Sequence, residues 1–187
     1  RRIGLVGQIL RVRYERAGEV IPPPRLLDGS ELIEALRLQP GPLIGDLLDL
    51  GKIEAGIELA HTPCDLADLA NKAVEAARFQ VQHKELSLTM AIPVHISPVL
   101  GDAGRLRQVL NNLISNAVKY TPAGGRIAVR AREEANTVII EVEDSGIGIA
   151  RQSLPHLFSK FYRAPGPQTA KIPGTGLGLA IVKSIVE

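Results

Sequence analysis

Residues 105–122 read RLRQVLNNLISNAVKYTP and carry the clearest periodic pattern in the chain. Their apolar side chains recur at helical spacing and predict one buried helix face, formed by Leu106, Val109, Leu110, Leu113, Ile114 and Ala117. Beside this face, the same spacing places a polar stripe of Gln108, Asn112, Asn116 and Lys119. Asparagine is a poor helix former because its amide competes for backbone hydrogen bonds, so two asparagines in this stripe need a reason.

The polar stripe suits a complex of a nucleotide with a metal ion. Asn112, Asn116 and Lys119 follow one another at i, i+4 and i+7. Amide oxygens are ligands for a hard cation such as Mg²⁺, and an ammonium group is a partner for phosphate. The alternative is a solvated helix face whose amides pair with nearby backbone, and the stripe taken alone favours that alternative.

The flanking segments predict strands and helices that do not alternate strictly. Asp65 is an expected N-cap, and the helix after it repeats apolar residues at Leu66, Leu69, Ala73, Val74, Ala77 and Val81. Alternating side chains predict strands at 86–92, 126–131 and 137–143, the last two joined as a hairpin. Short helical stretches are expected near Leu154–Phe161 and Leu177–Val186. The predicted fold class is therefore α+β, a two-layer sandwich with helices on one face of a mixed, mostly antiparallel sheet.

Two glycine-containing segments add candidate ligand contacts. Asp144 ends the third predicted strand, and Gly146 and Gly148 follow it, so a carboxylate acceptor stands beside backbone that a ligand can approach closely. A strand-terminating turn is the alternative. Residues 174–180 read GTGLGLA and open a helix, where free amides can cradle phosphate. A glycine-rich hinge is the alternative there, and the spacing matches neither a Rossmann nor a Walker motif.

Four short sequence motifs, termed boxes, resemble in sequence and order those of the ATP-binding domain of sensor histidine kinases. The nucleotide fold of that domain (the Bergerat fold) is shared with gyrase-type topoisomerases, heat-shock chaperones and mismatch-repair ATPases. The asparagine box is NLISNAVKYTP, the first glycine box DSGIG, the phenylalanine box LFSKFYR (157–163) and the second glycine box GTGLGL. They extend over about residues 100 to 180. Chance agreement with all four, in order, is very rare, whereas a match to one box is common.

The resemblance implies a role for each matching residue, with ATP and Mg²⁺ as the ligands. Asn116 would coordinate Mg²⁺ between the phosphates with the help of Asn112, Lys119 would contact phosphate, and Tyr120 would pack on the purine. Asp144 would accept a hydrogen bond from the adenine amino group, with Gly146 and Gly148 giving the base room. Phe158 and Phe161 would anchor a mobile lid over residues 163 to 173. The phosphates would be wrapped by the second glycine box, Gly174, Thr175, Gly176, Leu177 and Gly178.

The resemblance also suggests how the chain is divided. Residues 1–30, with three consecutive prolines from Pro22 to Pro24, are expected to be a poorly ordered linker. Residues 31–60 resemble part of a dimerisation-type helical hairpin, interrupted by Pro40-Gly41-Pro42. Residues 61–187 are expected to be the catalytic domain, cut short before the final strands of the family.

The phospho-accepting histidine of the family is not visible in this sequence. The histidines are His61, His83, His95 and His156, and none has the expected context. We therefore expect the acceptor on a missing segment or another chain, with an intact dimerisation domain, a homodimer in the parent protein and a response regulator as partners.

Composition and charge exclude several classes of protein. Hydrophobic residues make up 45% of the 187 residues and charged residues 22%, unlike a disordered chain. The net charge of +2 provides no basic field for nucleic acid, and no nucleic-acid partner is expected. Cys64 is the single cysteine, which excludes an internal disulfide. No apolar run approaches the roughly 18 residues that span a bilayer, so we expect a cytoplasmic domain and leave open whether its parent protein has a membrane anchor.

The leading hypothesis is thus the ATP-binding catalytic part of a sensor histidine kinase, an enzyme that transfers the γ-phosphoryl group of ATP to a histidine in a two-component phosphorelay. The first alternative is an ATP-sensing module that binds without catalysis because it lacks its own acceptor. A weaker alternative is the related serine-kinase branch of the same fold, against which the hairpin-like segment DLLDLGKIEAG (46–56) argues.

Overall fold

The computed structural model describes residues 8–11, 29–36, 41–54 and 60–186. Most of the expected linker and the end of the hairpin-like segment at 46–56 lie outside the described residues. The helices and strands, in chain order, are β1 (Gln8–Arg11), α1 (Gly29–Leu36), α2 (Pro42–Glu54), β2 (Thr62–Cys64), α3 (Leu66–His83), β3 (Ser87–Ala91), β4 (Val99–Gly101), α4 (Ala103–Tyr120), β5 (Arg126–Glu134), β6 (Thr137–Asp144) and α5 (Gly178–Val186).

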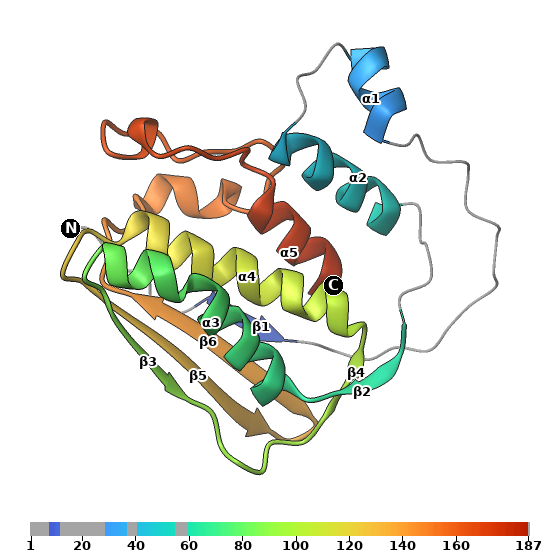
Figure 1. Ribbon diagram of the computed structural model, residues 1–187, viewed down its shortest axis with the longest axis vertical. Coiled ribbons are helices and arrows are strands. Elements are labelled where there is room, and N and C mark those ends of the chain that lie inside the picture. Colours follow the sequence, from blue (N-terminus) through green and yellow to red (C-terminus); the bar gives the residue numbers. More distant parts are fainter. Residues whose placement is uncertain (1–7, 12–28, 37–40, 55–59, 187) are drawn as a thin grey trace.

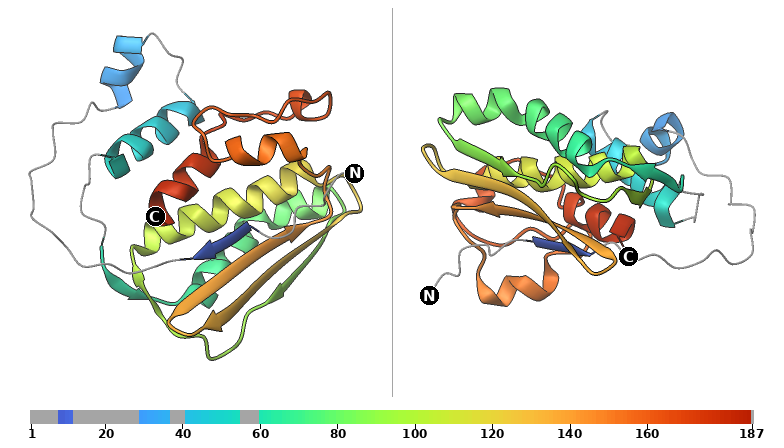
Figure 2. Two further views of the ribbon diagram at one scale, coloured as in Figure 1. Left: turned by 180° about the vertical axis from the view of Figure 1, so that it is seen from behind. Right: turned by 90° about the horizontal axis from the view of Figure 1, so that it is seen from below.

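The main sheet of the described residues has the order β1-β6-β5-β3. β5 and β6 form an antiparallel hairpin with Val129 opposite Val142, and β1 pairs with β6, also antiparallel. β3 runs parallel to β5, so the chain between them must cross over the sheet, and α4 makes that crossing. α3 and α4 cover one face of the sheet, and the view from behind shows the sheet in front of them (Figures 1 and 2). The predicted α+β sandwich with a mixed, mostly antiparallel sheet is confirmed.

Two aspartates begin the long helices. Asp65 accepts hydrogen bonds from the amides of Ala67 (2.9 Å) and Asp68 (3.1 Å), as an N-cap does, so the predicted cap is confirmed. Asp102 caps α4 by accepting from the amide of Arg105 at 3.0 Å, and this hydrogen bond lowers the pKa of Asp102. Each of the two long helices therefore begins directly after an aspartate that caps its N-terminus.

The core lies between these helices and the sheet. All six residues of the predicted α4 face are buried, together with Val118. They meet the inward side chains of the hairpin, which are Ile127, Val129, Ala131, Val138, Ile140 and Val142. In α3, Leu66, Leu69 and Ala73 are buried as predicted, whereas Val74, Ala77 and Val81 are only half-buried at its margin.

The strand predicted at 86–92 is shorter and less buried than its alternation suggested. β3 covers Ser87–Ala91, Leu88 is half-buried and Met90 is 37% exposed. β3 is the outer strand of the described sheet, so α3 and α4 do not cover all of its inward side.

Two further segments differ from their predictions. Where a helix was expected near Leu154–Phe161, the chain forms a 3₁₀ helix at Arg151–His156, because Pro155 cannot donate a backbone hydrogen bond. Within the linker expected at 1–30, Gln8–Arg11 form strand β1, which no sequence pattern indicated.

A second, smaller core joins α2 to the end of the chain. Leu50 on α2 is buried with Leu177 and Ile181, and α2 lies beside α5 (Figure 1). α2 begins at Pro42, so this proline occupies the first turn, where its missing N–H group costs no helical hydrogen bond.

Candidate functional site

A cavity of about 630 Å³ lies above the polar stripe of α4. Five segments line it: the start of α2, α4, the end of β6 with the residues that follow it, residues 157–173, and the second glycine box with the start of α5. Ten of the predicted site residues line this cavity, namely Asn112, Asn116, Lys119, Tyr120, Asp144, Gly148, Gly174, Thr175, Gly176 and Gly178. The structure therefore brings together residues that are up to 66 positions apart in the chain, such as Asn112 and Gly178.

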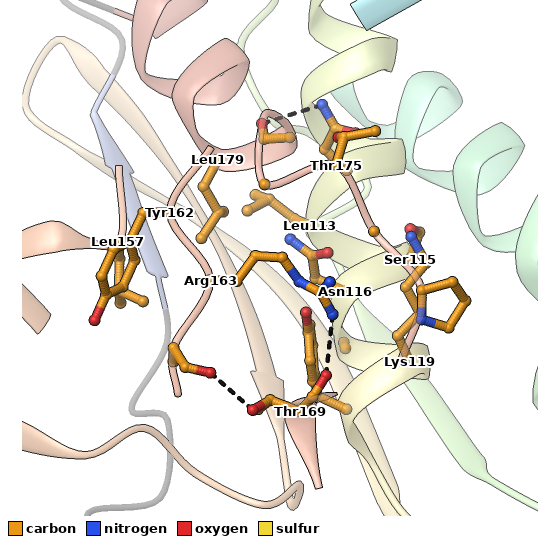
Figure 3. Close-up of a pocket in the computed structure, with 18 of the residues that line it drawn as sticks. Leu113, Ser115, Asn116, Lys119, Leu157, Tyr162, Arg163, Thr169, Thr175 and Leu179 are labelled. Atoms are coloured by element: carbon orange, nitrogen blue, oxygen red, sulfur yellow. Dashed lines mark hydrogen bonds between the residues drawn. The ribbon is translucent and has the colours of Figure 1, made fainter. Parts of the chain in front are cut away.

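The asparagine stripe faces the glycine loop. The Nδ2 atom of Asn112 donates to the carbonyl oxygen of Gly178 at 3.3 Å, which ties α4 to the start of α5. Figure 3 shows Asn116 in the middle of the cavity wall, with Lys119 further along the same helix. Gln108, at the other end of the stripe, instead donates to Asp49 of α2 at 2.7 Å.

Asp144 is a half-buried carboxylate at the end of β6. Burial raises the pKa of Asp144, the hydrogen bond from the Gly146 amide (2.8 Å) opposes this, and the nearby charge of Glu143 adds to the rise. Gly146 does not line the cavity but lies beneath Asp144, since a Cβ there would stand 2.5 Å from the Asp144 carboxylate and 2.6 Å from the Tyr120 carbonyl oxygen. Only glycine fits this contact.

The second glycine box is shaped by contacts on both sides. Gly176 has a φ of +76° and packs against the backbone of Phe161, where a Cβ would be 2.7 Å from the Phe161 carbonyl carbon. Thr175 accepts from the Leu177 amide and donates to Asp46 of α2 at 2.8 Å. Leu177, predicted to bind the phosphates, is fully buried in the small core and does not line the cavity.

The segment between the last two boxes is folded on itself. Arg163 donates to the carbonyl oxygens of Thr169 (3.0 Å) and Ile172, and Thr169 donates to Ala164 at 2.7 Å. In Figure 3 the Arg163 side chain reaches across the cavity toward Asn116. Phe158 and Phe161 are 40% and 57% exposed and do not line the cavity.

Sequence reasoning missed several polar residues of the cavity wall, among them Arg163, Thr169 and Asp46. Arg163 ends the phenylalanine box, and a cation next to aromatic residues in a matching box was a usable signal. Thr169 lies in a segment without periodicity, and Asp46 is 129 positions from its partner Thr175, so neither had a local signal.

Among the described residues, no group of three or more His, Cys, Asp or Glu side chains could hold a metal ion, and no helix is long and apolar enough to cross a membrane. A metal ion in this cavity would need oxygen ligands from a bound ligand in addition to the few side-chain oxygens of the wall.

The model of the histidine kinase-, DNA gyrase B- and HSP90-like ATPases matches residues 101–187. A signal transduction histidine-protein kinase/phosphatase, MprB of Mycobacterium ulcerans, is 32% identical over 180 residues, which is 96% of this chain and 34% of that protein. The circadian input-output histidine kinase CikA of Synechococcus elongatus is 37% identical over 78% of this chain and 20% of its own length. The chain thus spans about a third or less of these relatives.

Solved structures agree with these likenesses. Full-length ShkA in complex with AMPPNP superposes with a TM-score of 0.66 at 31% identity, over 76% of this chain and 29% of that one. The mycobacterial sensor histidine kinase MprB superposes with a TM-score of 0.56 at 30% identity, over 67% of this chain and 77% of that one. The fold is that of an ATPase of the histidine kinase, gyrase B and HSP90 type. Within that class, the chain belongs to the sensor histidine kinases, and residues 101–187 match their ATP-binding domain.

Proposed function

We propose that this chain binds Mg·ATP in the cavity above α4 and supplies the γ-phosphoryl group for transfer to a histidine. The observation that carries the proposal is the cavity itself, which gathers the amides and ammonium of α4, the Asp144 carboxylate and the second glycine box around one space of about 630 Å³. A nucleoside triphosphate needs these three kinds of group, because it has a base, a sugar and a chain of charged phosphates.

The adenine base is assigned to the end of the cavity near β6. The ionised Asp144 carboxylate only accepts hydrogen bonds, which suits the exocyclic amine of adenine and opposes the carbonyl that guanine has at that position. Tyr120 and Gly148 line the cavity near Asp144, and the packing of Gly146 holds the carboxylate in place.

The phosphates are assigned to the part of the cavity between α4 and the second glycine box. Lys119 and Arg163 are the cationic side chains among the described lining residues, and the backbone of Gly174 to Gly178 offers amides at the start of α5. Mg²⁺ fits the donor set because the Asn112 Nδ2 atom is bound to Gly178, which leaves its amide oxygen, with that of Asn116, for a hard cation. When bound, Mg²⁺ neutralises phosphate charge, while the chain orients the nucleotide and excludes water.

The accepting histidine is assigned to another segment or chain. All four histidines lie in the described residues and none lines the cavity. An intact dimerisation domain, a homodimer of the parent protein and a response regulator complete the proposed phosphorelay. We propose that residues 31–60 are the remnant of that dimerisation region, that residues 61–187 are the catalytic domain, and that both act in the cytoplasm.

A transfer assay tests this function. The chain is incubated with γ-labelled ATP, Mg²⁺ and a separate, intact dimerisation domain, and the expected result is acid-labile label on a histidine of that domain. Acid-stable label on a serine would support the serine-kinase branch. Binding of Mg·ADP by calorimetry without any transfer would support an ATP-sensing module, and absence of binding would contradict both functions.

A further inference from the structure

The C-terminal end of α4 lacks one of its own hydrogen-bond donors. In an α-helix the carbonyl of Val118 would accept from the amide of residue 122, but residue 122 is proline and has no N–H group. Thr121, the residue before this proline, is extended with φ −88° and ψ 124°, so the helix ends there. Val118 is buried, and an unpaired carbonyl at this place would be costly.

Lys84 supplies the missing donor from another element. It follows α3, and its Nζ atom donates to the carbonyls of Val118 (2.7 Å), Thr121 (2.6 Å) and Lys119 (3.3 Å). An ammonium group has three protons, so these three acceptors match its capacity. Its positive charge also lies at the helix end where the partial charge is negative.

The remaining carbonyls of this helix end have backbone donors. Ala117 accepts from the Thr121 amide at 3.0 Å, and Tyr120 accepts from the Ile147 amide at 3.1 Å. With Lys84, every carbonyl from Ala117 to Thr121 has a named donor. A backbone hydrogen bond also joins Lys84 to the segment after α4, because the Gly124 amide donates to the Lys84 carbonyl at 3.2 Å.

This helix end positions one half of the cavity. Lys119 and Tyr120 line the cavity directly, whereas Lys84 does not. The Tyr120 carbonyl also holds the first glycine box through Ile147 and touches the space where Gly146 has no Cβ. A shift of this carbonyl therefore moves Asp144 and its neighbours with it.

We propose that Lys84 is a positioning residue of the nucleotide site: its ammonium replaces the backbone donor that Pro122 lacks and sets the place of the adenine-binding end of α4. This proposal rests on the function proposed above, since Lys84 would fix the position of that nucleotide site.

The test uses the full chain and a double substitution. Lys84→Met keeps the apolar stem and removes the donors, so the affinity for Mg·ADP falls by about tenfold, as for one lost charge-assisted hydrogen bond. Lys84→Arg keeps the charge and the donors and retains affinity within about threefold of the wild type. Pro122→Ala restores an amide at position 122, which can donate to the Val118 carbonyl once the helix continues to that residue, so adding it to Lys84→Met recovers most of the affinity. The matched control is Lys72→Met on α3, whose ammonium contacts Asp68 on the exposed face and which leaves affinity unchanged.

Amide hydrogen exchange distinguishes a local loss of order at the end of α4 from a general loss of stability. In Lys84→Met, exchange speeds up at the Ile147 and Thr121 amides, while the Leu106 amide at the other end of α4 keeps its protection. Unchanged affinity in Lys84→Met would overturn the proposal, and so would failure of Pro122→Ala to restore affinity or folding in the double variant. If the wild type itself binds no Mg·ADP, the proposed function fails, whereas the exchange pattern still decides whether Lys84 holds the helix end.

Discussion

At the scale of single residues, the cavity contains a charged side chain, Asp144, whose burial lowers the stability of the protein without ligand. Asp144 is half-buried, and burial raises its pKa above the ordinary value of an aspartate. Between the unfolded-state pKa and this raised pKa, the folded protein binds more protons than the unfolded chain, so the free energy of unfolding decreases as pH rises through that window. At neutral pH the ionised Asp144 therefore destabilises the free protein, although adenine recognition needs it.

Asp144→Asn tests this balance. We expect the affinity for adenine nucleotides to fall about 10- to 100-fold, because an amide mispairs with the adenine amine in a partly buried site. The melting temperature of the ligand-free variant should exceed that of the wild type at pH 8, and the difference should shrink as pH falls through the raised pKa. Glu75→Gln is the control, since Glu75 is exposed, pairs with Arg78 and does not line the cavity. Unchanged adenine affinity in Asp144→Asn would refute the assigned role.

Gly146→Ala tests the close packing beneath Asp144. The added methyl would stand 2.6 Å from the Tyr120 carbonyl oxygen, so backbone must shift, and we expect a loss of about 1–3 kcal/mol in the free energy of unfolding together with weaker nucleotide binding. Gly45→Ala is the matched control, because Gly45 is exposed on α2 with nothing within 4 Å and alanine favours a helix by about 0.5–1 kcal/mol. Chemical denaturation of both variants measures the contrast, and equal stabilities would argue against the packing.

The sequence reveals residues whose role is local and misses those whose role depends on distant partners. Asn112 and Asn116 stood out because asparagine is unfavourable inside a helix, and Asp144 because it ends a strand before two glycines. Leu177 lies in the same box as the cavity glycines but is buried with Leu50 of α2, directly before α5 begins. Lys84 carries no pattern at all, because its acceptors are backbone atoms 34 to 37 positions away.

At the scale of elements, α2 is attached to the catalytic layer by two aspartates on one side of a small apolar core. Asp49 accepts from Arg105 (2.9 Å) and Gln108 (2.7 Å), and Asp46 accepts from Thr175 in the second glycine box. The side chains of Arg105 and Asp49 are only 20% and 33% exposed, so solvent screens this pair less than the surface pairs of α3. The sequence suggested a hairpin-like helical segment at 46–56 but not this docking, since the partners of both aspartates lie far along the chain.

Asp49→Ala tests the attachment. Two acceptors disappear from half-buried donors, so we expect the free energy of unfolding to fall by about 1–3 kcal/mol, with faster amide exchange in α2. Asp68→Ala removes an exposed i,i+4 partner of Lys72 and its N-cap-adjacent charge, and should cost about 0.5 kcal/mol or less. Similar costs for the two variants would contradict a specific role for Asp49.

At the scale of the whole molecule, the fold was predictable in class because periodicity changes from helix to strand and back at the right places, and because four boxes specify one family. Periodicity could not predict which strands join the β5–β6 hairpin, or in which direction they run. The strand β3 pairs parallel with β5 across the intervening α4, and β1 adds to β6 from a segment with no strand pattern.

Ligand-linked stabilisation tests the site across the whole molecule. At a free Mg·ADP concentration 100 times its Kd, the free energy of unfolding should rise by about 2.7 kcal/mol. GDP at the same concentration should give much less, and a chelator should remove most of the effect of ADP, because the phosphates then lose the cation that Asn112 and Asn116 help to hold. Thermal unfolding measures all three conditions, and an ADP effect that survives the chelator intact would count against the assigned metal role.

The tight turn between β5 and β6, with Ala135 at φ +52°, divides the cavity residues into two groups. Asn112, Asn116, Lys119 and Tyr120 precede it, while Asp144, Arg163 and the second glycine box follow it. A chain cleaved at this turn would leave each fragment with half of a binding site and unpaired hairpin edges. A nucleotide that binds residues of both fragments would then favour their association, so reassembly of the two fragments would depend on ATP.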